Sequence, residues 1–259
     1  MTWAQRRKLT IVMLVLLVLA TALSLVVRQA TKVAPTCYDK KQNQGEVGVD
    51  CGGPCTFYCV GELQDPKVRW VRTFDIRPGI VHAVAYIEHT YPTAAARQIR
   101  YSFKLYDENN TLIQERTGST FLGTMGRTAI VETLIKTGTV KPAIVRFSTL
   151  PPLPWEKIPG AYSQVVLKTD RTLLESQPDL TRVTATIENT SRISFRDVHV
   201  VAILYDKDDN AVNASQALLL SLPGESSQTV TFTWPFVMPV PISRIEIIPR
   251  ANPFTSSAL

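Results

Sequence analysis

The sequence has very little of the side-chain chemistry on which most enzymes depend. It contains only three histidines, His82, His89 and His199, and none stands beside a candidate nucleophile or in a metal-binding doublet. The patterns G-x-S-x-G and H-E-x-x-H, the phosphate-binding loop and the dinucleotide-binding fingerprint are also absent. We therefore predict no catalytic residue and expect the chain not to be an enzyme. A site assembled from scattered acids leaves no motif, so an envelope hydrolase or a carbohydrate-binding protein is the alternative hypothesis.

Acidic residues are missing from the first 36 positions. Five basic residues lie there and account for most of the net charge of +6: Arg6, Arg7, Lys8, Arg28 and Lys32. A nucleic-acid-binding protein concentrates its basic excess on the folded part, so we expect no nucleic-acid partner. We assign the charge to a membrane surface instead.

The stretch 10–27 carries no charge and is long enough for a short membrane-spanning helix. Basic residues directly before it predict a cytoplasmic tail at 1–9 and an extracytoplasmic remainder. The competing interpretation is a cleaved signal peptide, because Ala20-Thr21-Ala22 follows an apolar run. The apolar run continues beyond Ala22, which favours an uncleaved signal-anchor in the cell membrane.

All four cysteines lie in one polar segment, 28–62, which we call the cysteine box: Cys37, Cys51, Cys55 and Cys59. Outside a membrane, such clustering predicts two disulfides in a unit too small to build its own core, and the sequence leaves three pairings open. A zinc site is the rival interpretation, but the spacings of thirteen, three and three residues differ from those usual for structural zinc. They also match none of the common iron–sulfur spacings.

The cysteine box also carries oxygen ligands at Asp39, Asn43, Glu46 and Asp50. Calcium prefers carboxylate and amide oxygens in a loop that glycines allow to turn. The segment resembles a cysteine box, C-x-D-G-x-x-N-x-x-E-x-x-x-D-C-G-G-x-C, of bacterial surface proteins, although Lys40 replaces its first glycine. A calcium site is therefore one hypothesis, and the capping of turns by solvated side chains is the other.

The remainder of the chain alternates between apolar and polar residues at the period of β-strands. Tyr101, Phe103 and Leu105 alternate with polar neighbours, and a strand with the same Leu-Tyr-Asp ending returns at 198–210. In the second copy Val201 and Ile203 blur the alternation, which predicts a central strand covered on both faces. About seven short strands per copy predict an all-β fold of two tandem immunoglobulin-like sandwiches.

The segment Phe103-Lys104-Leu105-Tyr106-Asp107 matches the FxLYD motif of a family of small immunoglobulin-like domains in bacterial envelope proteins. The second copy retains Leu204, Tyr205 and Asp206, with Ala202 in the place of the phenylalanine. The chain as a whole resembles uncharacterised membrane-anchored envelope proteins of candidate-phylum bacteria. This resemblance implies a fold and a location but no known activity. Asp107 and Asp206 are expected to begin turns.

The predicted boundaries are a first sandwich at 63–150, a proline-rich linker at 151–160, a second sandwich at 161–250 and a disordered tail at 251–259. Prolines make a linker semi-rigid and extended, so we expect the two sandwiches to be held apart as a stiff rod, with Trp155 packed against one of them. The functional expectation is a membrane-anchored, non-enzymatic interaction or spacer module of the cell envelope. Its expected partners are the membrane and other envelope proteins, with no cofactor except the calcium considered above.

Overall fold

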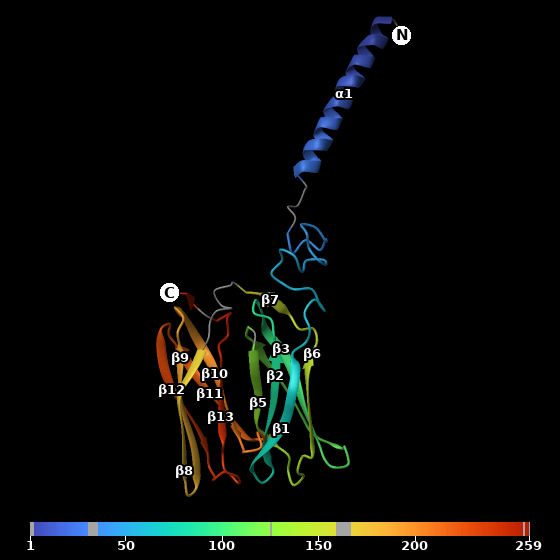
Figure 1. Ribbon diagram of the computed structural model, residues 1–259. Helices are drawn as coiled ribbons and strands as arrows, with labels where there is room; N and C mark the ends of the chain where they lie inside the picture. Colours follow the sequence, from blue (N-terminus) through green and yellow to red (C-terminus); the bar gives the residue numbers. More distant parts are fainter. Residues whose placement is uncertain (1–2, 31–35, 125, 159–166, 256, 259) are drawn as a thin grey trace. The chain divides into compact units, whose positions relative to one another are not determined.

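The computed structural model describes residues 3–30, 36–124, 126–158, 167–255 and 257–258 (Figure 1). It divides into two compact units, Met1–Cys55 and Thr56–Leu259. The first contains the helix and most of the cysteine box. The second consists of four β-sheets that form two sandwiches.

The helix α1 extends over Trp3–Ala30, beyond the stretch that the sequence predicted on both sides. Its most apolar part, Gln5–Arg28, has a mean hydropathy of 2.9, and none of it is buried by protein. Large exposed apolar surfaces of this kind mark contacts with a membrane or with another protein. The helix is consistent with either a signal-anchor or a signal peptide.

The first sandwich is built from two antiparallel sheets in the strand orders β1-β2-β5 and β4-β3-β6. Its strands are β1 (Lys67–Arg77), β2 (Ile80–His89), β3 (Ala94–Tyr106), β4 (Leu112–Leu122), β5 (Gly126–Lys136) and β6 (Ile144–Leu150), with the short β7 (Trp155–Lys157) paired to β3. The first, second and fifth strands share one sheet, and the third, fourth and sixth share the other. This crossing between sheets is the immunoglobulin-like arrangement that the sequence predicted.

The second sandwich repeats this arrangement with the orders β12-β9-β8 and β11-β10-β13. Its strands are β8 (Leu167–Gln177), β9 (Leu180–Asn189), β10 (Ile193–Tyr205), β11 (Ala211–Leu222), β12 (Ser226–Trp234) and β13 (Arg244–Arg250). The short β14 (Ser257–Ala258) pairs with β10. The repeat seen in the sequence is therefore a repeat of structure.

Each sandwich has its own core between its two sheets. In the first, Phe103 and Leu105 of β3 are completely buried, as their alternation predicted. In the second, the equivalent β10 contributes Val200, Ala202 and Leu204. The opposite face of β10 is buried as well, so the prediction from Val201 and Ile203 is confirmed.

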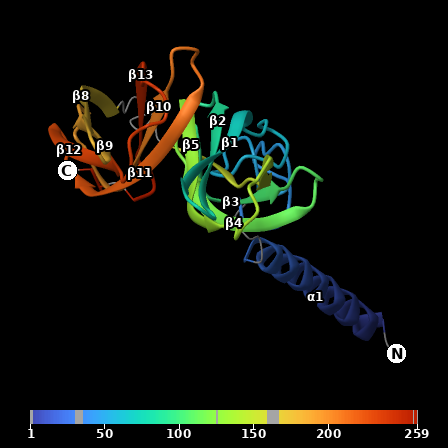
Figure 2. The same cartoon turned by 90° about the horizontal axis from the view of Figure 1, so that it is seen from below.

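The first sandwich covers the second face of β10. Phe74, Val84, Tyr86, Ala129 and Val131 of β1-β2-β5 pack against Val201, Ile203, Tyr205, Ala211, Ala214 and Ile248 of β11-β10-β13. Both views show these two sheets next to one another (Figures 1 and 2). The expectation of domains held apart by a stiff linker is therefore wrong, because their facing sheets bury a shared apolar layer.

Two of the predicted boundaries also need correction. Part of the predicted linker is β7, which pairs with Ala94–Ala96, and Trp155 packs in the first core as expected. The tail is not disordered over its described residues, since β14 pairs with β10 and the Phe254 ring lies under the Arg97 guanidinium. Residues 159–166, which include the last two positions of the predicted linker and the predicted start of the second sandwich, lie outside the described residues.

Candidate functional site

The cysteine box is held by disulfides, as predicted. Cys37 is bonded to Cys55, Cys51 and Cys59 are disulfide-bonded as well, and no cysteine is free. Gly53 has a positive φ of 51°, and a Cβ there would lie 2.1 Å from the carbonyl oxygen of Gly45. The close turn of the loop therefore requires glycine at this position.

The predicted calcium ligands accept hydrogen bonds from within the box. Asp50 Oδ1 accepts from the backbone N–H of Asp39 at 3.0 Å, and Oδ2 from that of Lys40 at 2.9 Å. Asp39 accepts from the Asn43 amide at 2.9 Å, which lowers the pKa of the Asp39 carboxyl. These carboxylates already serve as turn caps, so calcium remains a prediction.

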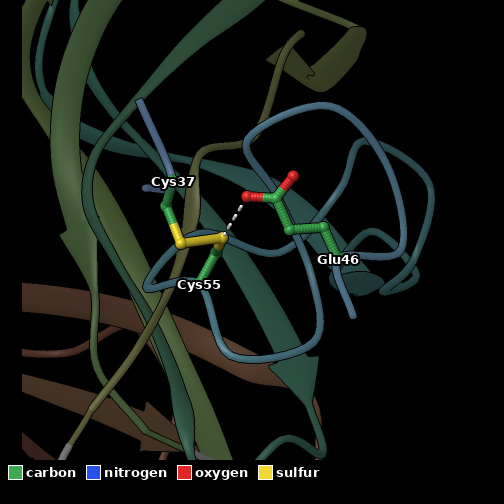
Figure 3. Close-up of side chains that lie close together, drawn as sticks. All are labelled: Cys37, Glu46 and Cys55. Carbon is green, nitrogen blue, oxygen red and sulfur yellow. Dashed lines mark hydrogen bonds between the residues drawn. A yellow bond between two sulfur atoms is a disulfide. The ribbon is translucent and has the colours of Figure 1, made fainter. Parts of the chain in front are cut away.

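Glu46 is the buried acid of the box. Its Oε2 accepts from the backbone N–H groups of Asn43 and Asp50, and its Oε1 lies 3.1 Å from Cys55 Sγ (Figure 3). A disulfide sulfur carries no hydrogen, so this last approach is a polar contact only. Cys37, Glu46 and Cys55 are close enough to share an ion, but metals bind thiolates, and neither sulfur is a thiolate in the oxidised box.

The repeated Leu-Tyr-Asp motif forms the same turn in both sandwiches. Asp107 Oδ1 accepts from the backbone N–H groups of Asn109 and Thr111, and Asp206 Oδ1 accepts from those of Asp208 and Asn210. The aspartates cap the turns after β3 and β10, as expected. Their carboxylates are therefore occupied by the backbone.

The interface between the sandwiches contains a cluster of hydrogen-bonded polar groups. Glu246 of β13 accepts from the hydroxyl of Tyr86 at 2.7 Å and from that of Tyr205 at 2.9 Å. Burial and the neighbouring carboxylate raise the pKa of both tyrosines, that of Tyr205 to about 12. Arg127 of the first sandwich lies 3.7 Å from the same carboxylate. Glu246 thus links the two sandwiches.

Arg250 makes a second connection across this interface. Its guanidinium is buried and donates to the carbonyl oxygens of Phe121 at 2.6 Å and Ala129 at 3.3 Å, and to Thr120 Oγ1 at 3.0 Å. Burial lowers its pKa to about 10. The cation stays charged at neutral pH, and its hydrogen bonds offset part of the desolvation.

The three histidines contribute no catalytic arrangement among the described residues. His89 is buried, neither ring nitrogen has a hydrogen-bond partner, and its ring centroid lies 5.5 Å from that of Trp155. Burial, with a smaller contribution from Arg250, lowers the pKa of His89 to about 4. Burial also lowers the pKa values of His82 and His199. All three are therefore expected to be neutral at neutral pH.

A groove of about 1630 Å³ lies where the two sandwiches meet. One wall is Val71–Arg77 of β1 with the turn that follows, and a second is the segment 137–145, which follows β5 and includes the start of β6. The start of β11 and the segment 235–239 complete it from the second sandwich. Because this groove needs both sandwiches, the sequence alone could not predict it.

The residues that link the sandwiches were also missed. In the sequence, Arg244 and Glu246 alternate with Ile245 and Ile247, which places them on the outward face of the last strand when the second sandwich is taken alone. The available signal was the apolar outer face of β10, which implied a cover. Nothing in the local pattern identifies the first sandwich as that cover.

No family model matches this chain, and no curated protein matches it in sequence. Among solved structures, it is similar to red sea bream transglutaminase, with 8% sequence identity and a TM-score of 0.23 over 74% of this chain. The matched part spans 30% of the transglutaminase chain.

Proposed function

We propose that this chain is a membrane-anchored extracytoplasmic protein that acts as a non-enzymatic interaction module of the cell envelope. The observation that supports this most strongly is the groove between the sandwiches. Two domains that are packed together and jointly line a groove present a partner with one preformed surface. A spacer role alone would not require such a surface.

The position of the groove also supports the proposal. The chain reaches the first sandwich at Phe57, which forms a β-bridge to Glu156 of β7, and β7 pairs with the first residues of β3. The groove lies at the other end of β3, where Ala143 donates its N–H to the Tyr106 carbonyl. Strands rise about 3.3 Å per residue, so β3 separates the groove from the tether by roughly 40 Å. A groove at the free end is accessible to partners.

The residues that line the groove argue against the hydrolase alternative. Its lining includes a single acidic residue, Asp75, whose carboxylate lies 2.9 Å from Lys141 Nζ. Hydrolysis of glycosides usually needs two carboxylates on either side of the bond. A binding role fits this lining better.

The proposal is tested by photo-cross-linking in the cells that produce the protein. A photoreactive amino acid is placed at Ile76 in the groove or at Thr186 of β9, with each adduct identified by mass spectrometry. We expect one specific envelope protein to be cross-linked. The adduct should disappear when the ectodomain is removed. Turnover in a broad hydrolase screen, abolished by one acid or serine substitution, would overturn the non-enzymatic assignment.

A further inference from the structure

We propose that the groove binds an extended segment of a partner protein, which adds as a strand to the edge of β1 and places a carboxylate against Arg77. This inference rests on the proposed function and specifies the chemistry of the partner. It has three supports: the free edge of β1, the size and composition of the groove, and the distribution of its charges.

The edge of β1 supplies the backbone groups. Among the described strands, β1 is hydrogen-bonded only to β2, so it is an edge of its sheet. Seven consecutive residues of β1, Val71–Arg77, line the groove. Because successive side chains of a strand point to opposite faces, a continuous lining means that the groove follows the strand edge. Such an edge offers unpaired N–H and C=O groups to an added strand.

The size and walls of the groove suit a polypeptide better than a small molecule. Pockets for small ligands usually measure about 300–1,000 Å³, and this groove is larger. Apolar side chains from both sandwiches line it, including Ile76, Val140, Ile144, Phe236 and Val237. A strand with alternating apolar side chains could bury them here while its backbone pairs with β1.

The charges in the groove favour a partner with a carboxylate. Asp75 is paired with Lys141, and Arg72 donates to the carbonyl oxygen of Ala211 at 2.9 Å. Arg77 is exposed, and no partner is found for its guanidinium in the described part of the chain. A guanidinium binds a carboxylate through two parallel hydrogen bonds. An aspartate or glutamate in the added strand would complete this pair.

The test uses the full chain in nanodiscs and fluorescent decapeptides of alternating valine and threonine. The peptides carry aspartate or lysine at one central position. Anisotropy should show that the aspartate peptide binds about tenfold more tightly than the lysine peptide. Arg77→Ala should remove this preference. Arg100→Ala, an exposed arginine on β3 in the other sheet of the same sandwich, should retain it.

Strand addition makes a second prediction, which does not depend on charge. N-methylation of one alternate set of peptide residues should abolish binding, whereas methylation of the other set, which faces away from β1, should be tolerated. Equal tolerance of both sets would overturn strand addition. An unchanged aspartate preference in Arg77→Ala would overturn the role of Arg77.

Failure of this inference is distinguishable from failure of the proposed function. If no decapeptide binds at millimolar concentration but cross-linking from Thr186 identifies a partner, the inference is wrong and the interaction role remains. Self-association that Ile76→Lys abolishes would make a second copy the occupant and would overturn the inference as well. If neither Ile76 nor Thr186 gives a specific adduct, the interaction role itself is contradicted.

Discussion

Two equivalent positions, His89 and Asn189, show how the repeated sandwich diverges at single residues. Each follows an Ile-Glu pair near the end of the second strand of its sandwich. Asn189 is completely buried and donates to the carbonyl oxygens of Ile193, Leu222 and Pro223. His89 is also buried, but its ring lies against Trp155 without a hydrogen bond. At this position the first sandwich therefore has an aromatic contact where the second has hydrogen bonds.

This difference predicts a pH dependence at the His89 position that has no counterpart at Asn189. Its folded-state pKa of about 4 lies below the unfolded value of 6.5, so protonation favours the unfolded chain. The stabilisation is complete above about pH 6.5 and is lost as the pH falls towards 4, by at most about 3 kcal/mol. Urea unfolding between pH 7 and 4 should show this extra loss in the wild type relative to His89→Gln. Parallel curves for the two proteins would contradict the prediction.

The cores of the two sandwiches also differ in their aromatic residues. In the first, the Tyr101 hydroxyl donates to Glu132 at 2.6 Å, and the Phe103 ring packs at a tilt against Phe147 with ring centroids 4.9 Å apart. In the second, Ala202 takes the place of Phe103, and Phe232 and Trp234 of β12 contribute the aromatic volume. The departure from the FxLYD motif is therefore accommodated by larger residues on another strand.

Phe103→Ala should strongly destabilise the first sandwich. The side chain is completely buried, and its loss removes apolar contacts and leaves a cavity. The free energy of unfolding should fall by about 3–5 kcal/mol. Lys104→Ala changes a half-exposed neighbour on the opposite face and should remain within about 0.5 kcal/mol of the wild type. Urea unfolding measures the free energy of unfolding of both variants. A loss below about 1 kcal/mol for Phe103→Ala would contradict the prediction and show that the core tolerates the cavity.

At the scale of elements, the cysteine box is stabilised by disulfides and by carboxylates that cap its turns. We expect Asp50→Ala to loosen the box, because two backbone N–H groups lose their acceptor, which costs about 1–3 kcal/mol where they are shielded from water. Asp50→Asn retains an acceptor oxygen and should leave the box ordered. Amide exchange at Asp39 and Lys40 measures the difference, and equal exchange in both variants would show that the charge rather than the acceptor matters.

Calcium binding is tested with the same pair of variants. If the ion binds, titration calorimetry should show heat at about 10⁻⁴–10⁻³ M calcium, the range of extracellular calcium-binding modules, and Asp50→Asn should abolish it. No heat at several millimolar calcium would leave turn capping as the role of these carboxylates.

At the scale of the whole molecule, the two sandwiches should unfold together. Their shared layer is apolar, and Arg250 adds hydrogen bonds across it. Calorimetry of the full chain in detergent should show one transition for both sandwiches. Arg250→Met keeps most of the volume but leaves buried carbonyl groups unpaired, so it should lower the melting temperature by about 2–4 °C per kcal/mol lost and separate the transitions. Arg192→Met changes an exposed arginine and serves as the control.

The topology makes a further prediction about the whole chain. Protease added to intact cells with a permeable envelope should remove the region after Val27, because the basic residues before α1 favour a cytoplasmic N-terminus. Full protection of that region would contradict the orientation. A mature N-terminus at Leu23 would show that the helix is a cleaved signal peptide.

The sequence by itself determined the features that depend on local pattern. Alternating residues placed β3 and β10 in their cores, clustered cysteines indicated disulfides, and an uncharged apolar run indicated α1. It also showed that β10 must be covered on both faces, because Val201 and Ile203 break the alternation. What it left open was the cover, since an apolar face carries no information about which surface buries it. Only the tertiary structure decided that the first sandwich packs there, that Arg250 and Glu246 link the two, and that their junction forms a groove, because these contacts join residues more than a hundred positions apart.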